Sequence, residues 1–195
     1  MIKIKRLIGL IILLVALVGC SDDSAEYKQN LKSAVDDVMK NTGEIEDVVE
    51  DYAFIWSLSI ENSSPIPVWE MAVHTGLDED EVESIFEINN AGNVTNDFSS
   101  NIHSLKSRFE ENGTIEEIKN SIKDVKDQVS ELNDPPKGYD KVYDELLELY
   151  DLSETYAEMA LDPSGSLQDF TSKKNQVLDD IKGKQKRIDV LMPND

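Results

Sequence analysis

The sequence predicts an all-α protein: an antiparallel up-and-down helical bundle of about four to five helices, preceded by a cleaved signal peptide. Three observations favour this fold. Apolar residues recur at intervals of three and four over most of the chain, as they do along one face of a helix. Short breaks rich in proline, glycine and asparagine separate these stretches, and such short connections place consecutive helices antiparallel. No strand-like alternation of apolar and polar residues is evident.

Residues 1–19 have the features of a signal peptide. Lys3, Lys5 and Arg6 precede an apolar run over residues 7–19. A membrane span needs ~20 apolar residues, so this run is too short to cross comfortably. We therefore expect residues 1–19 to be removed on export.

The apolar run ends in Leu17, Val18, Gly19 and Cys20, and Cys20 is the only cysteine of the chain. This motif resembles the lipobox of bacterial lipoproteins. The resemblance implies cleavage before Cys20 and attachment of a diacylglyceryl group, with palmitate as one possible acyl chain. Two or more acyl chains would anchor the protein stably at the extracytoplasmic face of the cell membrane. An ordinary secretory signal with a cysteine at this place by chance is the alternative.

The part that follows the signal peptide is strongly acidic. The whole chain has 19 basic and 40 acidic residues and a net charge of −21, which becomes −24 without the three basic residues of the signal peptide. The charge argues against nucleic acid as a partner, because phosphate binding needs basic residues, and anionic lipid would repel the domain. We expect residues 20–30 to be the lipidated cysteine and an acidic tether, and residues 31–195 to be the helical bundle domain.

The first predicted helix covers residues 31–59. Pro65 and Pro67 follow its end, and each proline favours extended geometry in the residue before it. The predicted helix has a continuous stripe of residues that should face a neighbouring helix: Leu31, Val35, Val38, Thr42, Ile45, Val49, Tyr52, Trp56 and Ser59.

The second part of the pattern runs from Asp78 to Phe109. Residues 78–81 resemble an N-cap with an acidic first turn. Residues 89–93 are poor helix formers, so we expect a kink or a break there. The apolar stripe of this part is Val82, Ile85, Phe86, Val94, Phe98, Ile102, Leu105 and Phe109.

Three further helices are predicted over residues 115–132, 139–160 and 167–191. Residues 114–117 have the pattern of a capping box, and Ser166 with Asp169 should cap the last helix. One domain is the preferred interpretation. The last three helices could instead form a separate unit, and the stripes could serve coiled-coil oligomerisation, although the short turns favour pairing within the chain.

One segment between the predicted helices is a possible partner surface. Ile66, Val68, Trp69, Met71 and Val73 place five apolar residues within eight positions after a proline-bent connection. An exposed apolar patch of this kind marks a binding surface. Alternatively, residues 62–77 fold over the end of the bundle as a hydrophobic lid.

Three stretches of the second half carry a further resemblance: residues 135–139, 146–150 and 162–166. They are similar to helical regions of uncharacterised lipoproteins from Bacillus-type bacteria. This resemblance covers about a third of the chain and implies a helical fold, with no activity to transfer.

The sequence shows no pattern typical of an enzyme, a metal site or a cofactor site. Glu70 and His74 could meet on one helical turn, but such a lone pair is more often a surface contact than a ligand set. His103 stands beside an apolar stripe, as a boundary residue does. With Cys20 lipidated, no cysteine is left as a nucleophile. We therefore expect a non-catalytic protein that contacts an unknown envelope protein; a carrier of a small apolar ligand within the bundle is the alternative.

Overall fold

The computed structural model describes the backbone of residues 3–61 and 64–193 and the side chains from Asp23 onward within these ranges. The described chain is mostly helical, which confirms the all-α prediction. In chain order its elements are α1 (Lys3–Glu61), β1 (Ile66–Pro67), α2 (Val68–Thr75), α3 (Glu79–Ile85), β2 (Asn93–Val94), α4 (Phe98–Glu111), α5 (Thr114–Glu131), α6 (Asp140–Leu161) and α7 (Leu167–Leu191).

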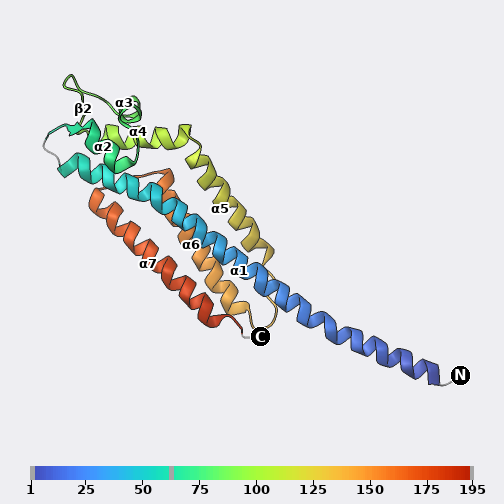
Figure 1. Cartoon of the computed structure of the whole chain (residues 1–195). Helices are drawn as coiled ribbons and strands as arrows, with labels where there is room; N and C mark the ends of the chain where they lie inside the picture. Colours follow the sequence, from blue (N-terminus) through green and yellow to red (C-terminus); the bar gives the residue numbers. More distant parts are fainter. Residues whose placement is uncertain (1–2, 62–63, 194–195) are drawn as a thin grey trace.

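The long helix α1 organises the molecule. It packs against α4, α5, α6 and α7, and α6 also packs against both α5 and α7. Figure 1 shows the later part of α1 lying along these helices, with the N-terminus projecting from one end. At the opposite end lie α2, α3 and the two short strands (Figure 1).

The predicted apolar stripes form the core. All nine residues of the α1 stripe, from Leu31 to Ser59, are buried. The same spacing of three and four runs from Tyr139 along α6, and these residues are also buried: Tyr139, Val142, Leu146, Leu149, Ser153, Tyr156 and Ala160. Phe98 is an exception in the stripe that ends at Phe109, because its ring is exposed and lies on the indole of Trp56, 5.9 Å away between ring centroids.

The helix α1 continues through residues 23–30, which the sequence predicts as a solvated tether. Tyr27 already belongs to the packed part of the molecule. Its hydroxyl donates a hydrogen bond to the carbonyl of Leu132 (2.9 Å), and its ring meets Tyr139 edge-on at 5.2 Å. The packed domain therefore begins close to Tyr27 rather than at Leu31.

A two-stranded sheet was not expected from the sequence. Ile66 pairs with Val94 and Pro67 with Asn93 in an antiparallel ladder. The expected break at residues 89–93 forms a turn that leads into the second strand, because Gly92 adopts a left-handed conformation (φ 77°) and its amide donates a hydrogen bond to the carbonyl of Asn89. Two-residue strands are too short to show alternation in the sequence.

Of the predicted helix caps, the one at Ser166 is confirmed and the one at residues 114–117 is not. Ser166 caps α7 as expected, accepting a hydrogen bond from the amide of Asp169 at 3.1 Å. The predicted capping box over residues 114–117 is wrong. The helix α5 starts after Gly113 in a left-handed conformation, and the side chain of Asn112 accepts the hydrogen bond of the Thr114 amide instead.

Candidate interaction surface

The end of the molecule opposite the N-terminus is here called the distal cap. It comprises residues 54–61 at the end of α1 and residues 64–105, which contain the sheet, α2, α3 and the first part of α4. The polypeptide reaches this end by running the length of α1 (Figure 1). The predicted partner surface lies within the distal cap.

The structure divides the predicted partner residues between the core and the surface. Ile66, Val68 and Met71 are buried, whereas Trp69 is 59% exposed. Val73, one helical turn after Trp69, is 71% exposed. Within α2 the division follows the helical period, because Trp69 and Val73 are four residues apart and share one face, whereas Ile66 precedes the helix in β1. The buried three act as a lid over the core, and only Trp69 and Val73 remain accessible.

Trp69 and Val73 form part of a continuous surface, here called the apolar pad. Together with Ala72 and Leu77 they line an open hollow beside the junction of α2 and α3. The same hollow is bordered by the acidic residues Asp78 and Glu79. The pad is therefore an apolar surface with carboxylates directly at its edge.

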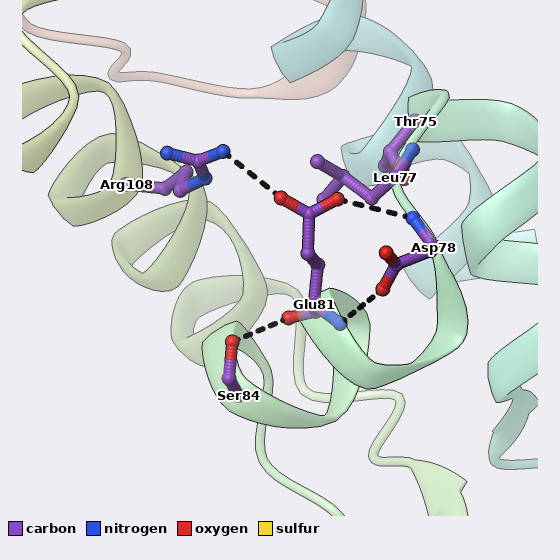
Figure 2. Close-up of polar contacts among 6 residues, drawn as sticks. All are labelled: Thr75, Leu77, Asp78, Glu81, Ser84 and Arg108. Carbon is purple, nitrogen blue, oxygen red and sulfur yellow. Dashed lines mark hydrogen bonds and ion pairs between the residues drawn. The ribbon is translucent and has the colours of Figure 1, made fainter.

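The helix α3, which carries these acids, is held by a network of hydrogen bonds (Figure 2). Asp78 accepts a hydrogen bond from the amide of Glu81 (2.8 Å), and the Glu81 carboxylate accepts one from the amide of Asp78 (3.2 Å). The other oxygen of Glu81 lies 3.4 Å from the guanidinium of Arg108 on α4. At the end of α2, the hydroxyl of Thr75 accepts a hydrogen bond from the amide of Leu77 (3.4 Å). The network holds the first turn of α3 and ties it to α4 through Arg108.

A buried asparagine joins α4 to α1 within the distal cap. The amide of Asn101 donates hydrogen bonds to the hydroxyl of Ser59 (3.0 Å) and to the carbonyl of Thr95 (2.9 Å). Ser59 in turn donates to the carbonyl of Ile55. Buried polar groups of this kind are costly when unpaired, so these bonds favour one arrangement of the cap.

The distal cap contains acidic residues but no lysine or arginine. Between Lys40 and Lys106 the sequence has fourteen acidic residues and no lysine or arginine. Glu79 and Asp80 are exposed in the first turn of α3, and no ion pair joins either of them to another described residue. The carboxylates beside the pad are therefore not neutralised by basic residues of the same segment.

The two histidines lie at the surface. The ring of His74 lies against that of Phe54 of α1, with centroids 4.4 Å apart and ring planes tilted by 35°. His103 is exposed and lines a polar groove with Glu81 and Arg108. Among the described side chains, no three His, Cys, Asp or Glu residues are grouped as a metal site would require.

The predicted lipidation site lies outside the described side chains. This applies to Cys20 and to the cleavage motif Leu17, Val18 and Gly19. Within the described residues, no helix combines the length and the apolar character that crossing a membrane demands.

Asp51 is a half-buried acid of α1, one turn before the distal cap. Burial, followed by the charges of Asp47 and Glu50, raises its pKa from 3.8 to about 6. A raised pKa means that the folded protein favours the neutral acid. The contribution to stability is therefore complete below pH 4 and is lost as the pH rises through 6.

We expect Asp51→Asn to stabilise the protein at pH 7.5. The rise of the pKa from 3.8 to about 6 corresponds to about 3 kcal/mol, and solvent screening of this part-exposed group reduces the gain to roughly 1 kcal/mol. The gain should vanish near pH 4, where Asp51 is protonated. Urea unfolding at both pH values measures it. The matched control is Asp179→Asn at an exposed position of α7, and an equal effect of both variants at pH 7.5 would contradict the assignment.

Sequence reasoning found Trp69 and Val73 but missed the carboxylates that border them. Two signals could have identified the full surface: the spacing of four between the two apolar residues, and the long interval without lysine or arginine that encloses them. No protein-family model, curated protein or solved structure matches the chain.

Proposed function

We propose that this protein is a membrane-anchored, non-catalytic lipoprotein of the extracytoplasmic face, and that it acts by contact with another protein of the cell envelope. The observation that carries the proposal is the exposure of Trp69 and Val73 at the end of the molecule opposite the N-terminus. Exposed apolar surface costs free energy in water, and a partner that covers it recovers that cost.

Lipid on Cys20 would place the contact surface far from the membrane. At a rise of 1.5 Å per residue, α1 spans ~60 Å between Cys20 and Glu61. A protein that stands upright on this helix presents its distal cap to the surroundings of the membrane rather than to the lipid. The negative charge of the domain supports this orientation, because anionic lipid headgroups repel it.

The proposed architecture is an antiparallel up-and-down bundle of α1, α5, α6 and α7. Short connections join α5 to α6 and α6 to α7, and α1 packs against all three. In such a bundle the helix ends gather at two poles. One pole would face the anchor, and the other would be closed by the distal cap.

Cys20→Ala tests the anchor and the contact together. We expect the unchanged protein to fractionate with membranes and to form crosslinked adducts with another envelope protein when intact cells are treated with a photoactivatable crosslinker. The variant should be found in the soluble fraction or the medium, because one residue supplies the whole lipid attachment, and its adducts should be lost. Fractionation and mass spectrometry of the adducts measure both effects.

Circular dichroism of the variant provides the control. The helical signal should be unchanged, because Cys20 precedes the packed part of α1 that begins near Tyr27. Retention of the Cys20→Ala variant on membranes would contradict lipid anchoring. Recovery of only the monomer from intact cells would contradict the contact function.

A further inference from the structure

The apolar pad and the acids beside it define the chemistry of a complementary partner. Trp69 and Val73 are exposed on one face of α2, and Leu77 continues this surface toward α3. Glu70 follows Trp69 on the same helix, while Asp78 and Glu79 line the hollow itself.

The carboxylates around the apolar pad have few basic residues near them in the sequence. Residues 64–105 contain eight acidic residues and neither lysine nor arginine. Arg108 of α4 approaches this region, but it is engaged by Glu81 (Figure 2). Only basic groups from outside this segment can therefore balance the negative charge beside the pad.

The rigidity of α3 adds specificity to this potential. The reciprocal bonds of Asp78 and Glu81 fix the first turn of the helix, and Glu79 and Asp80 stand in that turn. Because their backbone positions are set before any partner arrives, little ordering is required on binding. Preorganised charge of this kind favours one sign of partner strongly.

Two other occupants of the pad are disfavoured by the same charges. A second copy of the chain would bring its own acidic cap against this one, and juxtaposed like charges cost free energy. A membrane surface carries anionic headgroups that repel the cap. It would also lie about 60 Å away when the protein is anchored through Cys20.

We propose that the apolar pad binds a cationic amphipathic segment of another protein, in which an apolar side chain flanked by lysine or arginine covers Trp69 and Val73 while the basic groups pair with Glu79, Asp80 and Glu70. This inference rests on the proposed contact function and specifies its partner. The apolar contact supplies affinity, and the charges select the partner and speed its association.

A pair of synthetic peptides tests the proposal. The first has a Leu-Phe-Leu centre with two lysines on each side, and the second has the same centre with two glutamates on each side. Each carries a fluorescent label and is titrated with the full lipidated chain in non-ionic detergent. We expect the lysine peptide to bind at least about ten times more tightly than the glutamate peptide at low salt, and this preference to shrink as salt screens the charges.

Variants of the pad locate the site. Trp69→Ala should weaken binding of the lysine peptide at least about fivefold, because aromatic anchors dominate such contacts. The double variant Glu79→Gln with Asp80→Asn should weaken it about threefold at low salt and leave the fold intact, since Asp78 and Glu81 keep the cap. The matched control is Glu116→Gln with Glu117→Gln, which removes the same charge from the exposed first turn of α5 and should have no effect.

The outcomes separate this inference from the proposed function. Equal affinity for the two peptides, or binding that is insensitive to Trp69→Ala, would overturn the pad as a site for cationic segments. Trp69-dependent dimers in sedimentation, or Trp69-dependent binding to phosphatidylglycerol vesicles, would overturn it in favour of another occupant. If the peptides fail while crosslinked envelope adducts persist in the Trp69→Ala variant, the contact function stands and only the assignment of the surface falls.

Discussion

Leu146→Ala is expected to destabilise the protein by about 3 kcal/mol, within the range of roughly 2–5 kcal/mol seen for buried leucines. Leu146 is completely buried on the apolar face of α6. Truncation removes its apolar contacts and leaves a cavity that the surrounding helices fill only in part. For a chain of this size the loss corresponds to a drop in Tm of roughly 10 °C. Thermal and urea unfolding both measure it.

The next residue of α6 provides an unusually close control. Leu147 is 38% exposed, so Leu147→Ala removes the same atoms from the same helix without opening a core cavity. The two variants make the same change in helix propensity, which therefore cancels between them. We expect Leu147→Ala to cost less than about 1 kcal/mol. Similar costs for the two variants would contradict the placement of Leu146 in the core.

The core of this protein could be predicted from its sequence because helices bury residues at a fixed period. The intervals of three and four from Leu31 to Ser59 identify one face of α1, and all of the predicted residues are buried. The polar members Thr42 and Ser59 also fit, because each donates its hydroxyl to a carbonyl one turn earlier in the helix. Local geometry therefore satisfies the hydroxyl proton of each group, and Ser59 in addition accepts a hydrogen bond from Asn101 of α4.

The distal cap could be predicted only in part, because long-range contacts determine it. The break at residues 89–93 was readable from composition, but the strand that follows it pairs with Ile66 and Pro67, more than 25 residues earlier in the sequence. The capping pattern at residues 114–117 was misleading for a local reason. Gly113 reaches a left-handed conformation (φ 89°) that most residues avoid, and the helix begins directly after it.

The candidate surface could also be predicted only in part. Composition identified the apolar segment that contains Trp69, but five apolar residues in eight positions do not reveal which of them face solvent. The helical register of α2 decides this for Val68 and Met71, which it buries, while Ile66 is buried in the strand β1 before the helix. Cys20 is a different case, since its predicted role follows from a motif and from the chemistry of its thiol rather than from packing.

The second large effect that we expect is a loss of stability when the ion pair between Lys174 and Glu50 is broken. Lys174 is buried on α7 and its side chain is only 9% exposed, whereas the side chain of Glu50 on α1 is 52% exposed. Glu50→Ala would leave a buried ammonium group without this partner, and breaking a buried pair in this way is strongly destabilising. Glu50 also raises the pKa of Asp51, so its loss relieves some repulsion. We expect a net cost of about 2 kcal/mol in urea unfolding at pH 7.5.

Because only Lys174 is buried, replacing it should change the stability much less than replacing Glu50. Lys174→Met keeps a long apolar side chain in the core and leaves Glu50 in contact with water, so it should change stability by less than about 1 kcal/mol. The double variant should then be more stable than Glu50→Ala alone, because no charge is left buried. The control is Glu44→Ala, which breaks the exposed pair of Lys40 and Glu44 on the same helix and should cost less than about 0.5 kcal/mol. If Lys174→Met were as costly as Glu50→Ala, the pair itself would stabilise the fold, and burial of the ammonium group would not be what makes Glu50 necessary.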